Sequence, residues 1–361
     1  MAGRGDPPEG NPEGVPGGGE DEYRSVVFDE SFVRAARLQE FSAQERMGEH
    51  AQAVRDRPGW ESRGGGSRQA VMLVLLILLA FGTAIYLGVR NPYQPPADRR
   101  AETTRTTLIR LAPQGRVPGG EPAQLFAHSP AAEYRTGASG INLPAVGRTT
   151  HFSEGQVVTA LSIAKDYLVA SSLEPDVLSG QTVRPARLLI DPDHLEQFDR
   201  SVESPLDDGR HAVAGWLVRF DPAKVVLADP APRVQGTLHF AETDTDTLDV
   251  TADHTFTYAL RPASSGAGPT AQASLFTVHR QLHFRFDRED LRMHRAELLT
   301  STVQAGPQAC GADTSGALRP MLAGELTSET GGPAVTDPYA SGRDAVSPLC
   351  GTLAPTALPA L

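Results

Sequence analysis

An apolar run at residues 69–89, QAVMLVLLILLAFGTAIYLGV, constrains this chain more than any other stretch. It holds no charged residue and is bracketed by Arg68 and Arg90. At about 1.5 Å per residue a helix of this length reaches ~30 Å, the thickness of a bilayer's hydrocarbon core. A buried core helix would carry polar residues along one face, whereas the polar side chains here are Gln69 and Thr83. The run therefore predicts one transmembrane helix at residues 69–89, with the lipid bilayer as a partner.

The cysteines indicate on which side of the membrane each end of the chain lies. Arginines flank the apolar run in similar numbers on both sides, so the positive-inside rule does not decide the orientation. The two cysteines, Cys310 and Cys350, both lie on the C-terminal side, and an even pair confined to one side suits a disulfide in an oxidising compartment. We therefore expect a cell-membrane protein with residues 1–68 in the cytoplasm and residues from Asn91 onward outside. The alternative is two unrelated buried thiols facing the cytoplasm.

The residues before the apolar run have the composition of a largely disordered segment. Residues 1–22 are rich in Gly, Pro and Glu and contain almost nothing apolar to bury. A helix is expected at residues 29–47, where neither Pro nor Gly occurs; it is either a docking helix for a cytoplasmic partner or a transient helix. After the apolar run, residues 90–144 are predicted to form a Pro/Gly-rich stalk and linker.

The charge of the chain argues against nucleic acid as a partner. The formal net charge is −11, and the basic residues form no concentrated block. Lys165 and Lys224 are the only lysines, so arginine supplies almost all of the basic residues. This bias is expected where GC-rich codons are favoured, and it indicates a high-GC bacterium.

The folded domain is predicted at residues 145–304 and begins with a helix. Ser153 and Gln156 have the spacing of a capping box, and apolar residues then recur at helical spacing to about residue 172. Beyond this helix we expect a strand at residues 182–190 and a short helix at residues 192–198.

The apolar period then changes from 3.6 to 2, which predicts antiparallel strands with one face in water. Strands are expected at residues 212–220, 225–227, 234–240, 248–260, 276–286 and 291–303, with a turn at residues 287–290. The predicted fold class is α+β: a disordered N-terminal segment, one transmembrane helix, and an outer domain in which a long helix packs on a curved antiparallel sheet.

The order of elements over residues 145–303 resembles the nuclear-transport-factor-like and cystatin-like domains, which also occur in single-pass actinobacterial proteins such as the Mce-associated membrane proteins. The arginine bias and the acidic, Pro/Gly-rich N-terminus also resemble an actinobacterial single-pass membrane protein. Cone-shaped sheets of this class often leave a cavity between helix and sheet. The residues expected to line such a cavity, unless side chains fill it, are Trp216, Phe240, Phe256, Tyr258 and Phe284.

No motif in the chain identifies a reaction. The nucleophile-elbow, HExxH, P-loop and dinucleotide-binding patterns do not occur, so no catalytic, cofactor-binding or metal-ligating residue is predicted. His279 and His283 share a strand face but lie about 13 Å apart, too far for one metal ion to bind both. His254 is expected to be buried with its hydrogen bonds satisfied. Ionisable residues gather at the short helix, a pattern that fits a capped, solvated helix start: Asp191, Asp193, His194 and Glu196.

These observations predict a non-enzymatic envelope protein whose outer domain binds a protein partner or acts as an assembly scaffold. Two alternatives stay open. One is a transmembrane sensor of a small apolar ligand; the other is an outer-face hydrolase, which needs a pocket that gathers histidine with aspartate or glutamate. The tail at residues 305–361 is expected to be loop-rich and tied back by a disulfide between Cys310 and Cys350.

Overall fold

The computed structural model describes residues 66–90, 102–263, 272–328, 332, 334–340 and 349–360. The predictions for residues 1–65, including the helix at 29–47, lie outside the described residues. The chain divides into two compact units, Met1–Pro95 and Pro96–Leu361, and each is described by itself.

The apolar run forms helix α3, Gly66–Arg90. Its large apolar side chains from Val71 to Phe81 are exposed. Within the described part of the chain, no helix combines the length and the apolar character that crossing a membrane requires. This finding contradicts the transmembrane helix predicted at residues 69–89.

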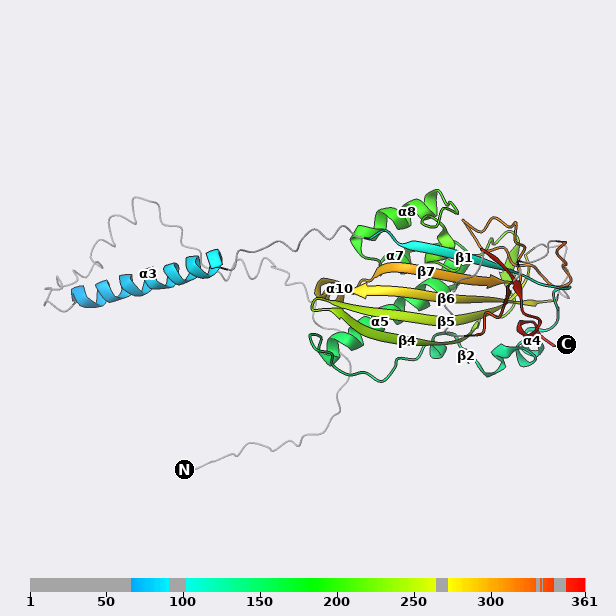
Figure 1. The fold of residues 1–361 in the computed structure, drawn as a ribbon, viewed down its shortest axis with the longest axis horizontal. Coiled ribbons are helices and arrows are strands. Elements are labelled where there is room, and N and C mark those ends of the chain that lie inside the picture. The colour runs from blue at the N-terminus through cyan, green and yellow to red at the C-terminus, as the bar shows by residue number, and fades with distance from the viewer. Residues whose placement is uncertain are drawn as a thin grey trace, which may run out of the picture. The chain divides into compact units, whose positions relative to one another are not determined.

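The described residues of the second unit build one nine-stranded sheet with the order β2-β4-β5-β6-β7-β1-β9-β8, and β3 pairs with β5 (Figure 1). The strands are β1 (Arg105–Ala112), β2 (Arg135–Thr136), β3 (Val225–Leu227), β4 (Arg233–Asp244), β5 (Thr247–Pro262), β6 (Ser274–Phe286), β7 (Glu297–Gly306), β8 (Val335–Thr336) and β9 (Cys350–Leu353). The sheet therefore extends beyond residues 145–304 in both directions along the chain, into the predicted linker and the predicted tail.

The sheet is mixed, which contradicts the predicted antiparallel sheet and makes the predicted α+β class wrong. The meander from β4 to β7 is antiparallel. However, β1 runs parallel to both β7 and β9, and β8 runs parallel to β9. The alternation of apolar residues shows which face of a strand is buried but carries no information on strand direction, so periodicity alone missed the parallel pairs.

The helices and 3₁₀ turns of this unit fill the connections between strands. They are α4 (Pro122–Ala127), η1 (Pro130–Glu133), η2 (Gly137–Gly140), α5 (Glu154–Ser172), α6 (Pro175–Leu178), α7 (Arg184–Arg187), η3 (Pro192–His194), α8 (Leu195–Glu203), α9 (Val213–Trp216), α10 (Arg288–Met293) and η4 (Pro355–Ala357).

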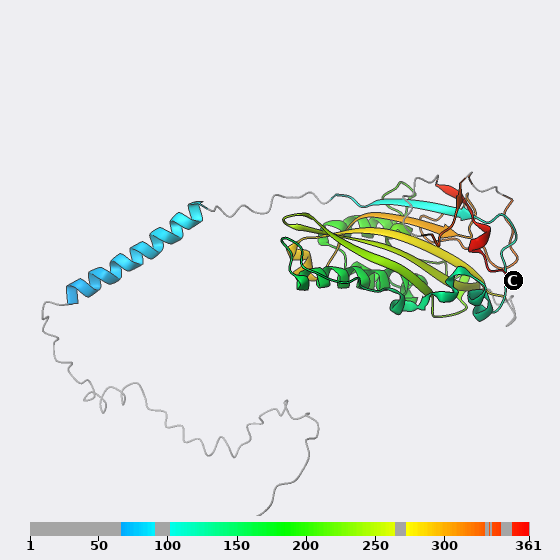
Figure 2. The same cartoon turned by 60° about the horizontal axis from the view of Figure 1, so that its bottom comes forward.

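Helix α5 begins as the sequence predicts. The Ser153 hydroxyl accepts a hydrogen bond from the Gln156 backbone N–H, and the Gln156 side chain accepts one from the Ser153 N–H, which completes the capping box. The apolar face of α5 packs on β5 and β4 and contributes Val157, Leu161 and Leu168 to the main core. Figure 2 shows α5 on one side of the sheet.

Two predicted strands are short helices instead. Residues 182–190 contain α7, because Pro185 occupies the first turn of a helix, where its missing N–H does no harm. Residues 212–220 contain α9, in which Gly215 lies so close to β1 that a Cβ there would collide with the Thr106 side chain. The short helix predicted at 192–198 is confirmed as η3 and α8, and the predicted turn at 287–290 continues into α10.

The second face of the sheet, predicted to be in water, is partly covered by the C-terminal segment. The Tyr339 hydroxyl lies 2.8 Å from the Thr277 hydroxyl, and Thr255 donates a hydrogen bond to the Pro338 carbonyl. A small apolar cluster forms where β9 and η4 meet β1, with Ile109 and Leu353 among its members. The predicted disulfide is confirmed: Cys310 is bonded to Cys350, with the two Cα atoms 5.5 Å apart.

Candidate functional site

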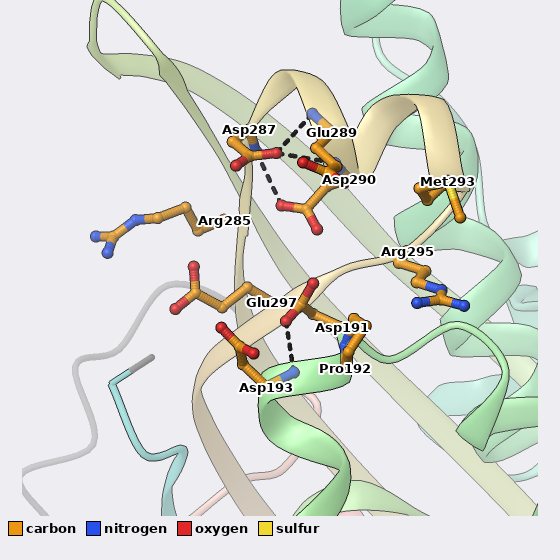
Figure 3. Close-up of a pocket in the computed structure, with 10 residues that line it drawn as sticks. All are labelled: Asp191, Pro192, Asp193, Arg285, Asp287, Glu289, Asp290, Met293, Arg295 and Glu297. Carbon is orange, nitrogen blue, oxygen red and sulfur yellow. Dashed lines mark hydrogen bonds between the residues drawn. The ribbon is translucent and has the colours of Figure 1, made fainter. Parts of the chain in front are cut away.

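A cleft of about 320 Å³ lies at one end of the sheet, where the chain turns from β6 through α10 to β7 beside η3 (Figure 3). Six of its ten lining residues are acidic and two are arginines. The lining residues are Asp191, Pro192, Asp193, Arg285, Asp287, Glu289, Asp290, Met293, Arg295 and Glu297. We call it the acidic cleft.

The acids of one wall are the cap of α10. The Asp287 side chain accepts hydrogen bonds from the backbone N–H groups of Glu289, at 2.7 Å, and Asp290, at 2.8 Å. Asp290 in turn accepts one from the Asp287 N–H at 3.0 Å, so the two residues form a capping box. Negative side chains are favoured at this position because the first turn of a helix presents unpaired N–H groups.

The opposite wall is the start of η3, which a long-range contact brings to α10. Asp191 caps η3 by accepting a hydrogen bond from the Asp193 N–H at 2.9 Å. The backbone N–H of Asp191 donates to the carbonyl of Ala296 at 3.0 Å, next to the start of β7. Figure 3 shows the carboxyl groups of Asp191, Asp193, Asp290 and Glu297 gathered in the gap between the first turn of α10 and η3.

Asp290 is the most deeply placed acid of the cleft, with 8% of its surface exposed. Burial raises the pKa of Asp290 to about 8, and the charges of Asp287 and Asp191 add to this increase. A hydrogen bond between the Asp290 and Asp191 carboxyls acts in the same direction. Burial and the neighbouring acids therefore favour the protonated form of Asp290.

The two arginines of the cleft leave its negative charge in excess. Arg285 points away from the gathered carboxyl groups (Figure 3), and its Nε lies 3.5 Å from the Asp249 carboxylate on β5. An excess of carboxylates at a concave surface attracts a cationic group such as a lysine or arginine side chain. Among the described residues, no group of three or more His, Cys, Asp or Glu side chains is arranged to hold a metal ion.

A second cleft of about 320 Å³ adjoins the acidic cleft and shares Asp193 with it. Its lining residues are Thr103, Asp193, His194, Glu196, Gln197, Arg200, Arg210 and His211. The His194 ring is 1% exposed, with Nδ1 3.2 Å from the Thr104 hydroxyl and Nε2 3.7 Å from the Glu297 carboxylate. Burial lowers the pKa of His194, against the opposing charges of Asp191 and Asp193. Both ring nitrogens face protein groups, an arrangement typical of a structural histidine.

The five residues predicted to line a cavity lie in the packed core of the domain, and none of them lines either cleft. The indole N–H of Trp216 donates to the Ser201 hydroxyl, and its ring packs edge-on against Phe198. Tyr258 donates to the Ser172 carbonyl. The remaining three members are Phe256 and Phe284, both fully buried, and Phe240, which is partly buried.

The sheet histidines are placed as their strand positions predict. His279 Nε2 lies 2.5 Å from the Asp253 carboxylate, and His283 Nε2 lies 3.0 Å from the Asp249 carboxylate. The two imidazoles thus bind separate aspartates. The hydrogen bonding predicted for His254 is wrong, because neither of its buried ring nitrogens has a hydrogen-bond partner among the residues that the structure describes.

The acidic cleft was not predicted from the sequence as a site. Its two acidic walls were visible, as DPDH at residues 191–194 and DRED at residues 287–290, each with the composition of a helix start. Their proximity depends on the pairing of Ile190 with Ala296, a contact between distant parts of the chain that a local pattern does not reveal. Comparison of the chain with models of protein families, with curated proteins and with solved structures finds no match.

Proposed function

We propose that this protein is a non-enzymatic binding module whose second unit holds a cationic segment of a protein partner in the acidic cleft. The observation that supports this proposal is the convergence of two capped helix starts, which places six acids around one concavity. The disulfide between Cys310 and Cys350 supports an oxidising compartment outside the cytoplasm as the place where the module works.

The other functions considered from the sequence have less support. An apolar-ligand sensor would use the space between α5 and the sheet, and there Trp216, Tyr258 and Phe284 are in close contact with their neighbours. A hydrolase would need an accessible histidine beside an acid in a cleft. In the second cleft His194 lies beside Glu297, but its ring is buried. His211 lies 2.6 Å from the Asp208 carboxylate, but Asp208 does not line the cleft.

The proposal is tested with the full-length protein and a synthetic peptide that carries three lysines separated by glycines. We expect binding by isothermal titration calorimetry that weakens severalfold as the salt rises from about 50 to 200 mM, because exposed charges are then screened. The same peptide with glutamate in place of lysine should not bind. Removing two exposed charges of the cleft, with Asp193→Asn and Glu289→Gln, should weaken lysine-peptide binding at least about fivefold, or roughly 1 kcal/mol.

Matched controls use exposed acids away from the cleft. Glu133→Gln combined with Asp176→Asn removes the same formal charge, and both residues are exposed. This variant should bind the lysine peptide as the unmodified protein does. Equal weakening by both pairs would mean that net charge, and not the cleft, attracts the peptide.

A crosslinking experiment in intact cells tests whether the cleft meets a protein. A photoreactive amino acid at Met293, an exposed residue that lines the cleft, should capture a defined partner. The same amino acid at Leu188, which is exposed and does not line the cleft, should not. Identical products from the two positions would contradict the proposal.

A further inference from the structure

The His254 side chain fills a space in the core, here called the slot, that is open because residue 236 on the neighbouring strand is glycine. It lies on β5, opposite Gly236 of β4 and opposite Arg280 of β6. A Cβ at Gly236 would lie 2.5 Å from the imidazole ring, so the ring fills the space where a side chain of β4 would otherwise be. The ring is fully buried and stacks on Phe256 with the ring centres 6.2 Å apart.

The imidazole is surrounded by groups that do not bind it. Both of its nitrogens are buried and have no hydrogen-bond partner in the described part of the chain. This is costly for any polar group and more so for a charged one. Its cross-strand neighbour on β6, on the same face of the sheet, is Arg280. Asp253 and His279 alternate with these residues on the other face, where they bind each other.

Arg280 already places one cation beneath the C-terminal end of α5. Its guanidinium donates hydrogen bonds to the hydroxyls of Ser171 and Ser172 and to the carbonyls of Gly215 and Trp216, at 2.7 to 3.2 Å. The titratable group that α5 contributes next to it is Tyr167, whose hydroxyl donates to the Trp216 carbonyl. These acceptors are occupied by Arg280 and Tyr167.

We propose that His254 is an acid trigger of this domain: its protonation adds a second, unbound cation beside Arg280 under α5, and the packing of α5 on the sheet is lost. The proposal does not depend on the function of the acidic cleft.

Acid favours the loss of this packing because the pKa of His254 is lower in the folded domain than in the unfolded chain. Burial lowers the pKa of His254 to about 4, with a smaller contribution from His279 and an opposing one from Asp253. An unfolded chain has a histidine pKa of about 6.5. Between these values the unfolded state binds more protons than the folded state, so the domain is fully stabilised above pH ~6.5 and loses stability as the pH falls toward 4. The full effect on the folding equilibrium is about 300-fold.

The test compares acid transitions of the full-length protein, followed by binding of a dye that fluoresces on exposed apolar surface. We expect a sharp rise in fluorescence as the pH falls from 7 to 3. His254→Phe keeps a ring in the slot and cannot be protonated, so its transition should move to lower pH by at least about half a unit. The control His239→Phe changes an exposed histidine of β4 and should leave the transition in place. An unchanged transition in the His254→Phe protein would overturn the proposal.

A measurement on the unmodified protein keeps the test independent of whether that variant folds. Exchange of the C2 hydrogen of each histidine with deuterium, read by mass spectrometry over a series of pH values, reports the titration of each ring. The His254 ring should exchange very slowly while the domain is folded and reach half-titration at the pH of the dye transition. Half-titration of His254 near that of free histidine, with the domain still folded, would refute the trigger.

Discussion

Arg280 shows how a single residue joins three parts of the core. Its guanidinium lies on β6 and is fully buried, and its four hydrogen bonds go to α5 and to the end of α9. The acceptors are neutral, so the charge is balanced by hydroxyls, carbonyls and the negative C-terminal end of the α5 dipole. The planar, forked geometry of the group is what allows it to reach both elements at once.

This geometry predicts different costs for two substitutions of Arg280. Arg280→Lys keeps the buried charge but cannot reach all four acceptors, so we expect a loss of about 3–5 kcal/mol in the free energy of unfolding. Arg280→Met removes the charge along with its desolvation cost and should lose less, about 2 kcal/mol. Urea denaturation measures both values. A lysine protein as stable as the arginine protein would show that a point charge suffices at this position.

Because of Asp290, we expect the domain to lose stability as the pH rises toward 8. Its pKa in the folded protein, raised to about 8, lies above the ~3.9 of an unfolded chain. The stabilisation is therefore complete below pH ~3.9 and is lost as the pH rises through 8. Melting temperatures should fall as the pH rises from 6 to about 8 and level off between 8 and 9.5.

Asn is the informative substitution, because it accepts from the Asp287 N–H and donates to Asp191 without titrating. Melting temperatures of the Asp290→Asn protein should fall less over the same pH range. The exposed residue Asp176 supplies the control, since Asp176→Asn should preserve the alkaline fall. A fall of the same size in the Asp290→Asn protein would place its origin elsewhere.

At the scale of elements, the sequence correctly predicted the helices and strands that are determined by local periodicity and by helix capping. The capping box at Ser153 and the alternation in β4 and β6 were visible because each depends on neighbours within a few residues. The short helices α7 and α9 were missed because an apolar run of four to nine residues fits a strand or a buried helix equally well. The acidic cleft and the covered outer face were missed because both depend on contacts between distant segments, such as Tyr339 with Thr277.

Strand β9 is the element whose position depends most on a covalent bond. It pairs with β1 over three residues, and Cys350 at its start is bonded to Cys310, 40 positions earlier. For a loop of this length the chain-entropy model gives ~4 kcal/mol of stabilisation. Replacing both cysteines with serine should therefore lower the melting temperature and speed hydrogen exchange of the β9 amides.

The same exchange experiment contains its own control. The amides of β5 and β6, which pair along 13 positions, should keep their protection in the serine variant. Loss of protection across the whole sheet would mean that the C-terminal segment is required for the fold. Unchanged protection of β9 would mean that its pairing with β1 is sufficient to hold it.

At the scale of the whole second unit, one core lies between the helices and the inner face of the sheet, and smaller clusters lie under α4 and under the C-terminal segment. The antiparallel meander from β4 to β7 is continuous in sequence. By contrast, β1 comes from the beginning of the unit, and β9 from its end. Beyond β7, the sheet therefore continues with neighbouring strands that come from opposite ends of the unit's sequence.

The interior position of β1 has a consequence for the order of events on the ribosome. Arg105 pairs with Thr300 and Arg110 with Cys350, so β1 is made long before either neighbour exists. At ~5–20 residues per second, the wait for β7 alone lasts roughly 10 to 40 s. During that time the apolar residues of β1, Leu108, Ile109 and Leu111, lack both of the strands that flank them in the folded domain. Such a segment is the binding target of holding chaperones, and we expect their contact with this chain to end only when β7 has been made.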